Sequence, residues 1–308
     1  MPASAASPFI SCAALSGVRV LSLALNLPGP AALMRCRQMG ATCIKLEPPA
    51  LGGHSADPMG QYAPTAYAQL HDGVEHVQAD LKTPEGQQTL HAELAQADVL
   101  ITSFRPSALK KLGLDWEALH ARYPRLSLVA IVGAPGGRAE EPGHDLTYLA
   151  ENGLVTGLEL PPTLYADMAG SLMASEAVLQ ALLLRAASKD GAGVRIEVAL
   201  SEAARYVALP RQWGLTQPPG SVGGAHAGYR VYPCRDGRVA IAALEPHFAQ
   251  RLCAAAGLGA EAGNAMFRSS THAAIAAFLQ GRDCDEIEAL AGQHDLPLHV
   301  LRDEAEPG

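Results

Sequence analysis

Three short segments of the sequence place acid–base side chains at the ends of predicted elements. His144 lies at the entry to a predicted helix, where the positive end of the helix dipole lowers the pKa of an imidazole and favours a neutral base. Asp167 opens a long apolar helix, beside backbone N–H groups that can hold an oxyanion. Glu245 follows a predicted strand and precedes Pro246, a position from which side chains often reach a cleft.

Each of these residues also has an ordinary structural interpretation. His144 can be a capping or surface histidine, Asp167 can be a helix N-cap worth about 1 kcal/mol, and Glu245 can be a solvated strand end. Better-known signatures are absent from the sequence. The segment 133–137 is glycine-rich and follows a strand, but it lacks a Walker lysine and the dinucleotide-binding spacing, so it favours a plain turn.

The first half of the chain alternates short apolar strands with amphipathic helices. Strands are predicted over 18–23, 42–46, 98–102 and 126–132, and helices over 31–39, 84–97 and 116–122. Residues 51–73 form a polar passage rich in glycine and proline. Buried strands connected by helices indicate a parallel sheet covered by helices. The prediction is therefore an α/β, Rossmann-like large domain over residues 1–204.

The second half has a different pattern. A helix over 167–189, a strand over 194–198 and a helix from Ser201 complete the large domain, and 217–224 indicates a linker or surface loop. Strands over 229–234 and 238–243 flank Arg235-Asp236-Gly237, a hairpin signal. The remainder is predicted as alanine-rich helix. A smaller α+β domain is expected over residues 205–308.

Composition excludes several classes of protein. The 308 residues are 48% hydrophobic and 18% charged, which excludes disorder, and a net charge of -8 argues against a nucleic-acid partner. Six cysteines without a CxxC pair predict no disulfide framework and no metal site, in a cytoplasmic protein. The start lacks a signal peptide's basic and apolar regions, and the apolar stretch 174–187 is too short and polar to span a membrane.

Taken in order, the motifs resemble family III CoA-transferases, the CaiB/BaiF group, and within it the α-methylacyl-CoA racemase branch. The resemblance runs from about Gly17 to Leu301. It depends on Leu27-Pro28-Gly29-Pro30, the run 40–49, Ala79-Asp80-Leu81-Lys82, Phe104-Arg105-Pro106, Gly143-His144-Asp145, Ala166-Asp167-Met168-Ala169-Gly170, the run 191–198 and Leu244-Glu245-Pro246-His247-Phe248.

The resemblance implies chemistry on an acyl-CoA thioester. Racemases of this family pair a Gly-His-Asp histidine with the aspartate, so His144 and Asp167 are expected to exchange a proton at the α-carbon. Glu245 is expected to orient His144, and N–H groups at the start of the Asp167 helix to receive the enolate charge. Coenzyme A, part of the substrate rather than a tightly bound cofactor, is expected to contact Ala79, Asp80, Leu81, Lys82, Arg105, Gly143 and Tyr148.

Two other activities are compatible with the same resemblance. The transferases of the family use the aspartate corresponding to Asp167 as a nucleophile that carries the acyl group, although they do not usually have a histidine at position 144. A non-catalytic CoA-binding paralogue is the third possibility. The family also implies an interlocked homodimer, with the active site between the large and small domains.

The sequence departs from the family pattern in four places. Acidic residues replace the usual basic run at 71–76, just before the predicted strand Ala79–Lys82, and Pro48 stands where racemases tend to have arginine. Such losses would weaken phosphate binding by about 1.5–3 kcal/mol for each charged hydrogen bond. The loop 158–163 is short for a racemase, and the chain stops at Gly308, where relatives continue through a further tail.

Overall fold

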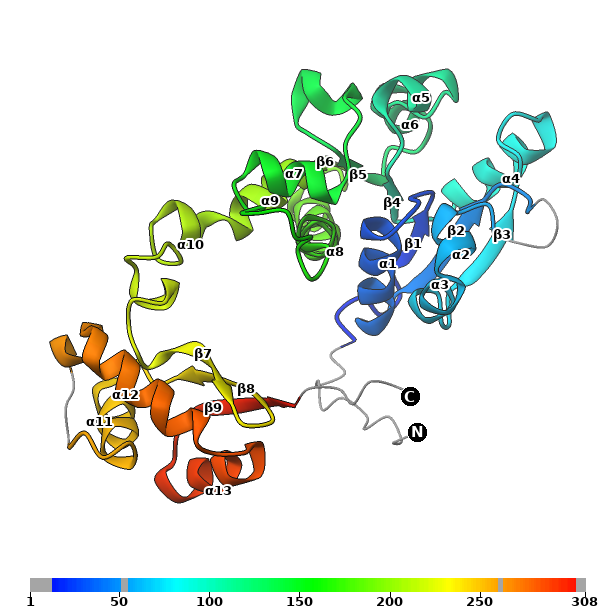
Figure 1. The fold of residues 1–308 in the computed structure, drawn as a ribbon. Coiled ribbons are helices and arrows are strands. Elements are labelled where there is room, and N and C mark those ends of the chain that lie inside the picture. The colour runs from blue at the N-terminus through cyan, green and yellow to red at the C-terminus, as the bar shows by residue number, and fades with distance from the viewer. Residues whose placement is uncertain (1–12, 51–54, 260–262, 303–308) are drawn as a thin grey trace. The chain divides into compact units, whose positions relative to one another are not determined.

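The chain forms two compact units, Met1–Ala208 and Leu209–Gly308, which are described separately below. Figure 1 shows the fold in a computed structural model, which describes residues 13–50, 55–259 and 263–302. The sequence predicts the division between residues 204 and 205.

A six-stranded parallel sheet forms the centre of the first unit. Its strands are β1 (Arg19–Ser22), β2 (Thr42–Glu47), β3 (Glu75–Gln78), β4 (Val99–Thr102), β5 (Ser127–Val132) and β6 (Arg195–Ala199). Their order across the sheet is β3-β2-β1-β4-β5-β6, the order of a doubly wound Rossmann sheet. In register, Leu21 of β1 lies between Ile44 of β2 and Leu100 of β4. The predicted α/β, Rossmann-like large domain is confirmed.

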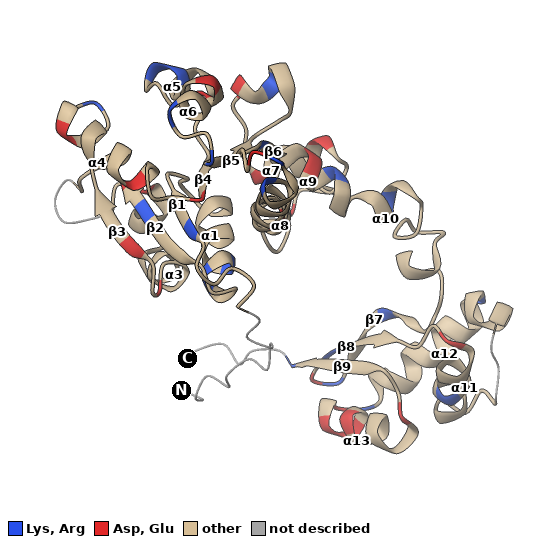
Figure 2. Ribbon diagram, turned by 180° about the vertical axis from the view of Figure 1, so that it is seen from behind, with Lys and Arg blue, Asp and Glu red and all other residues tan. Residues whose placement is uncertain are grey.

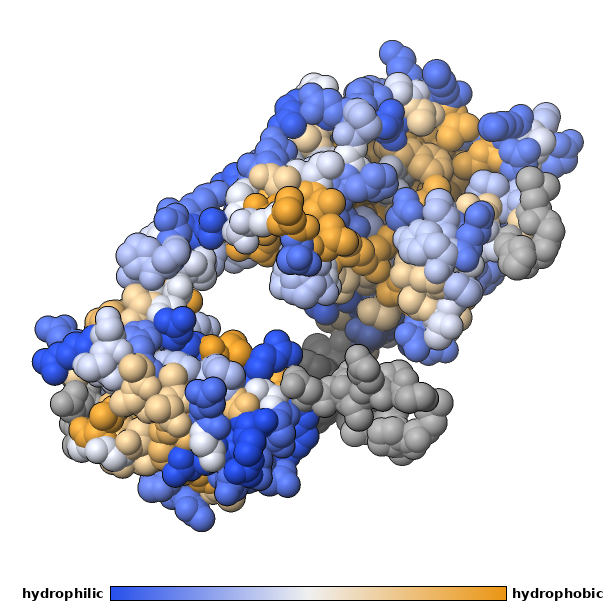
Figure 3. All heavy atoms as spheres, in the orientation of Figure 1, coloured by the Kyte–Doolittle hydropathy of each residue, from blue (hydrophilic) through white to orange (hydrophobic). Residues whose placement is uncertain are grey.

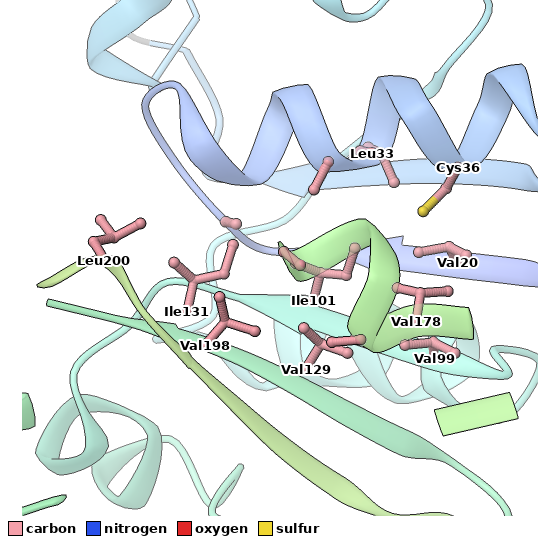
Figure 4. Packing of buried hydrophobic residues seen from close by; sticks show 14 of the residues in the cluster. Val20, Leu33, Cys36, Val99, Ile101, Val129, Ile131, Val178, Val198 and Leu200 are labelled. Carbon is pink, nitrogen blue, oxygen red and sulfur yellow. The ribbon is translucent and has the colours of Figure 1, made fainter. Parts of the chain in front are cut away.

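Helices cover both faces of this sheet because alternate strand residues point to opposite faces. On one face Val99 and Ile101 of β4 pack with helices α1 (Pro28–Gln38), α7 (Asp145–Glu151), α8 (Tyr165–Ala187) and α9 (Leu200–Val207) (Figure 4). On the other face Leu100 packs with α4 (Pro84–Leu94), α5 (Pro106–Lys111) and α6 (Trp116–Arg122). The run of apolar residues in each strand therefore follows from burial on both faces.

The glycine- and proline-rich passage before β3 contains two short helices, α2 (Pro58–Tyr62) and α3 (Pro64–Leu70). Asp57 caps α2 by accepting a hydrogen bond from the Met59 N–H, and a proline opens each helix. Residues 79–82 were predicted as a strand, and this prediction is wrong. They form the turn between β3 and α4, where Thr83 caps α4 as expected by accepting from the Gly86 N–H.

Helix α8 is 23 residues long, and by length and composition alone it could cross a membrane. The sequence prediction concerned only the apolar stretch 174–187, and the helix that contains this stretch begins at Tyr165. A core helix of a soluble protein has the same features, and α8 contacts α1, α7, α9, β5 and β6. Its few charged residues are Asp167, Glu176 and Arg185, and Figure 2 shows the rest of the helix without charge.

The second unit has a three-stranded antiparallel sheet in the order β7-β8-β9. The strands are β7 (Tyr229–Cys234), β8 (Gly237–Ala242) and β9 (Leu298–Arg302); the helices are α10 (Leu209–Gln212), α11 (Pro246–Ala255), α12 (Ser269–Gln280) and α13 (Cys284–His294). The predicted hairpin and α+β class are confirmed. The prediction that only helix follows the hairpin is wrong, because β9 returns to pair with β8.

Candidate active site

A cavity of about 330 Å³ lies at the carboxyl ends of β1, β4 and β5 in the first unit. In an open α/β sheet this edge is the expected ligand site, because the chain turns to opposite faces after the neighbouring strands β1 and β4. The lining residues are Leu25, Asn26, Pro28, Ser103, Phe104, Arg105, Ile131, Val132, Gly133, Ala139, Glu141, Pro142, Gly143, His144, Tyr148, Asp167 and Leu200. The structure thus brings five of the predicted site residues to one cavity: Arg105, Gly143, His144, Tyr148 and Asp167.

His144 immediately precedes α7, as the sequence predicts. Its backbone N–H donates to Thr147 Oγ1 at 3.1 Å, and the Thr147 hydroxyl donates back to the His144 carbonyl at 2.7 Å. These two bonds fix the backbone, while the imidazole is exposed and makes no hydrogen bond within the described part of the chain. His144 therefore presents a free ring to the cavity from a rigid helix entry.

Asp167 lies in the first turn of α8 but does not cap it. Asp145, which is only 4% exposed, accepts hydrogen bonds at its Oδ1 from the N–H groups of Ala166 at 2.7 Å and Asp167 at 3.0 Å. The capping interpretation of Asp167 is therefore wrong. The cap is Asp145, the aspartate of the Gly-His-Asp motif, which reaches the start of α8 from α7. The N–H groups of Ala166 and Asp167 are not available to an enolate, because Asp145 already accepts hydrogen bonds from both.

The Asp167 carboxyl is set up to exchange protons near neutral pH. It lies half-buried and makes no hydrogen bond within the described residues. Burial, together with the nearby charge of Asp145, raises the pKa of Asp167 to about 7. Such a group can act as an acid or a base at physiological pH without a large change in its surroundings.

Tyr148 and Arg105 add a hydrogen-bond donor and a positive charge to the same cavity. A Cβ on Gly133 or Gly143 would lie 2.3 Å or 2.5 Å from the Tyr148 hydroxyl, so both glycines are needed for the phenol to fit. Burial, with a smaller contribution from Asp167, raises the pKa of Tyr148 and keeps its hydroxyl protonated. Arg105 is exposed and its side chain forms no ion pair or hydrogen bond within the described residues, so its guanidinium is available to an anion.

Asn26 is a cavity residue that the sequence analysis missed. Its φ of 62° lies in the left-handed region, which is uncommon for a residue other than glycine. The Asn26 N–H donates to Asp57 Oδ1 at 3.0 Å, and the N–H of Leu25 donates to Ser103 Oγ at 3.0 Å. The sequence contained one indication of this role: Asn26 is a polar residue between an apolar strand and the segment Leu27-Pro28-Gly29.

A buried ion pair behind the cavity holds this loop. Lys45 Nζ lies 3.0 Å from Asp57 Oδ2, and both side chains are completely buried. The same ammonium donates to the Ala24 carbonyl, and Asp57 Oδ1 accepts from the N–H groups of Asn26 and Met59. One pair thus fixes the end of β2, the loop after β1 and the start of α2.

The remaining predicted residues lie elsewhere. Leu81 and Lys82 line a separate, open depression of about 640 Å³ that also includes Lys111 of α5. Ala79 is buried, and Asp80 accepts from the Lys82 N–H at 3.0 Å. Glu245 is exposed at the N-cap of α11 in the second unit, so its predicted role as the partner of His144 stays a prediction.

The altered segment before β3 has a structural role at His71. The ring is buried, its Nδ1 lies 2.8 Å from the Tyr67 carbonyl, and burial lowers the pKa of His71 to about 4. A neutral, buried imidazole cannot replace the basic residues that the family pattern has here.

Comparison with known proteins identifies the family of the chain. The family model for CoA-transferase family III matches residues 15–306. The chain belongs to this family. Its fold is shared with the crystal structure of a hypothetical protein from Mycobacterium tuberculosis, with a TM-score of 0.79 and 25% identity, covering 94% of this chain and 84% of that one.

Named relatives of the family include both kinds of activity. Succinate–glutarate CoA-transferase of Agrobacterium fabrum is 32% identical over 274 residues, which cover 80% of this chain and 67% of that one. Alpha-methylacyl-CoA racemase of Mus musculus is 30% identical over 265 residues, covering 80% and 66%. Most of the similar relatives are CoA-transferases by name, and overall identity does not separate the two activities.

Proposed function

We propose that this protein is an acyl-CoA racemase or epimerase that inverts the α-carbon of a 2-methylacyl-CoA-type thioester. The observation that carries the proposal is that His144 and Asp167 line one cavity, with the pKa of Asp167 raised to about 7. Inversion needs one group to remove a proton and a second to return one to the opposite face. An imidazole and a carboxyl group that line the same cavity can exchange these two roles when the direction of the reaction reverses.

The α-proton of a thioester is weakly acidic, so its removal requires stabilisation of the enolate oxygen. Asp145 occupies N–H groups at the start of α8, which leaves other donors for this role. The protonated Tyr148 hydroxyl is one, and the N–H groups of Asp145 and Leu146 in the first turn of α7 have no partner in the described structure. These donors lie next to His144 in sequence and stabilise the developing charge.

Coenzyme A is the group that the surrounding residues would hold. Arg105, Gly143 and Tyr148 line the cavity, and Lys82 with Lys111 adds positive charge to the separate depression beside α4 and α5. Phosphate groups bind to such exposed cations through charge-assisted hydrogen bonds. An acyl-CoA is therefore the proposed substrate, with its thioester at His144 and Asp167.

A homodimer is part of the same proposal. Leu164, Tyr165, Met168 and Leu172 are exposed on α8, and Leu158 and Leu160 are exposed in the loop before it. Figure 3 shows the apolar surface over α8. A contiguous apolar surface of this kind marks an interaction site.

The alternative is a CoA-transferase in which the Asp167 carboxylate attacks the thioester and carries the acyl group. The names of most relatives favour it. A carboxylate that is free of hydrogen bonds and reaches the cavity is also a suitable nucleophile.

Deuterium incorporation distinguishes the two activities. We expect the purified protein to exchange the α-proton of 2-methylacyl-CoA in heavy water without an acceptor acid. Asp167→Asn and His144→Gln should each slow this exchange by about 10²–10⁴-fold, whereas Asp285→Asn, at an exposed aspartate of the second unit, should leave it unchanged.

Absence of α-proton exchange, together with transfer of CoA to an added acceptor acid and an acyl-enzyme trapped by hydroxylamine at Asp167, would establish the transferase instead. Binding of acetyl-CoA in calorimetry without exchange or transfer would indicate the non-catalytic CoA-binding paralogue. Absence of acetyl-CoA binding would exclude both enzymes and leave a non-catalytic scaffold.

A further inference from the structure

The second unit contains a cluster of metal-ligating atoms that the proposed function does not use. Cys234 ends β7, Asp236 lies in the turn that follows, and Cys284 is the first residue of α13. The two sulfur atoms are 3.7 Å apart, and Asp236 Oδ1 is 3.9 Å from Cys234 Sγ. One ligand atom from each residue lies within 4.8 Å of the other two, and no other such group of histidine, cysteine and acidic residues occurs among the described residues.

The local fold holds these groups in place. The Cys284 N–H donates to Asp236 Oδ1 at 2.8 Å, which ties the hairpin turn to the start of α13. Cys284 is completely buried and Cys234 is 9% exposed, whereas Asp236 is open to solvent. A Cβ on Gly237 would lie 3.3 Å from Cys284 Sγ, so the glycine leaves room beside the thiol.

We propose that Cys234, Asp236 and Cys284 bind a thiophilic divalent cation of the Zn²⁺ class, with water at the fourth position. Zinc bonds thiolate sulfur at about 2.3 Å in a tetrahedron, which places two such sulfurs about 3.7–3.8 Å apart. The measured separation of the two sulfurs, 3.7 Å, has this value before any metal is added. The carboxylate supplies the oxygen ligand, and its exposed side gives the ion a path of entry.

A disulfide is the competing use of two neighbouring thiols, and the surroundings disfavour it. A disulfide holds its two sulfurs about 2.05 Å apart, whereas the sulfurs of Cys234 and Cys284 lie 3.7 Å apart. A disulfide also has no use for a carboxylate fixed beside it. A bound cation instead attracts all three groups, and both thiols release their protons to solvent when it binds.

Binding would join two segments far apart in sequence. Cys234 and Cys284 are separated by 50 residues, so the ion would link the hairpin to α13 in the folded state only. A ligand that binds the folded state and not the unfolded chain raises the melting temperature as its concentration rises. The site would therefore act on the stability of the second unit.

Cobalt is the probe for this site, because tetrahedral Co²⁺ bound to thiolate has a charge-transfer band in the near ultraviolet. The full chain, reduced and freed of metal, is titrated with Co²⁺ in a non-chelating reductant. We expect this band to saturate at one ion per chain, two protons to be released, and Zn²⁺ to displace the cobalt.

The variants separate this cluster from the other cysteines. Cys284→Ser should abolish the band, and Asp236→Asn, an exposed substitution that leaves both thiols in place, should weaken binding about tenfold or more. Cys253→Ala and Asp285→Asn, which alter a buried cysteine and an exposed carboxylate outside the cluster, should bind as the unaltered chain does. Absence of the band in the unaltered chain, or an equal band in Cys284→Ser, would overturn the proposal. So would a Cys234–Cys284 disulfide, found by mass spectrometry, in a chain that binds no metal when reduced.

Discussion

Two aspartates in the first unit are buried to different degrees and have opposite surroundings. Asp57 is completely buried, but it meets the Lys45 ammonium and two backbone N–H groups. Asp167 is less buried, yet its carboxyl group has no hydrogen-bond partner in the described residues and lies near a second carboxylate, Asp145. Burial alone therefore does not make a reactive carboxyl, because partners decide whether the charge is held or destabilised.

The two aspartates therefore have different roles: Asp57 holds the backbone around the cavity, and Asp167 is the reactive group. The satisfied pair fixes the backbone of Asn26 at the cavity, whereas the unsatisfied carboxyl reaches the cavity itself. Removing the Lys45 partner should leave Asp57 a destabilised carboxylate like Asp167. Removing the charge of Asp145 should make the carboxyl group of Asp167 easier to ionise.

The largest effect is expected when Asp57 loses its partner. Lys45→Met leaves a buried, uncompensated carboxylate, so the free energy of unfolding should fall by about 3–5 kcal/mol in urea titrations. Adding Asp57→Asn, which removes the charge but keeps an oxygen acceptor, should recover a large part of that loss. A single variant within 1 kcal/mol of the unaltered protein would show that the pair is not needed.

Asp167→Asn should raise the free energy of unfolding, whereas Lys45→Met lowers it. The folded-state pKa of about 7 exceeds the unfolded value near 4, so the folded chain holds an extra proton between these pH values and loses stability as pH rises through them. The asparagine variant lacks this slope and should be more stable above pH 7, by on the order of 2–4 kcal/mol. Parallel urea titrations from pH 4 to pH 8 test it; equal slopes would contradict the raised pKa.

Asp145 links the cap of α8 to the acidity of Asp167. Asp145→Asn keeps an oxygen for the N–H groups of Ala166 and Asp167 but removes the charge, so the pKa of Asp167 should fall below 7 in a carbon-13 NMR titration. Asp145→Ala also loses the cap and should cost about 1–3 kcal/mol of stability. An unchanged Asp167 titration in the asparagine variant would assign the shift to burial alone.

The smallest effect is expected at an exposed pair. Arg37 and Asp72 lie 3.2 Å apart, and 80% of the Asp72 side chain is exposed. Asp72→Asn should change the free energy of unfolding by less than about 1 kcal/mol and leave its dependence on pH near neutrality unaltered. A larger change would mean that an exposed carboxylate contributes as much to stability as the buried ones, which contradicts the comparison.

The sequence predicted most of the large sheet because its strands are continuous apolar runs. Leu128 to Val132, for example, is buried along its whole length and cannot be confused with an exposed segment. Strand β9 was missed, since only Val300 of Leu298–Arg302 is buried and the strand depends on pairing with β8, which is far away in sequence. Helices α2 and α3 were also missed, although Asp57 before Pro58 is a recognisable start signal.

At the site, the sequence motifs identified the candidate residues but not the groups to which those residues hydrogen-bond. His144 was correctly placed at a helix entry, and the Gly-His-Asp motif named Asp145 without showing what its carboxylate does. That carboxylate caps a helix whose first bonded residue is 21 positions away, a contact that only the packing of α7 on α8 creates. The Cys234–Cys284 approach is hidden for the same reason, because no local pattern spans 50 residues.

The cavity draws its lining from Leu25 to Leu200, almost the full length of the first unit. During synthesis the ribosome adds residues in order, and domains generally fold as units once their chain has emerged. Strands β1, β2 and β4 can pair early, but β6 and the Leu200 side of the cavity arrive last. A nascent chain cut before residue 195 would therefore contain His144 and Asp167 without the completed pocket. Acyl-CoA should consequently protect only nascent chains that extend beyond α9 from proteolysis.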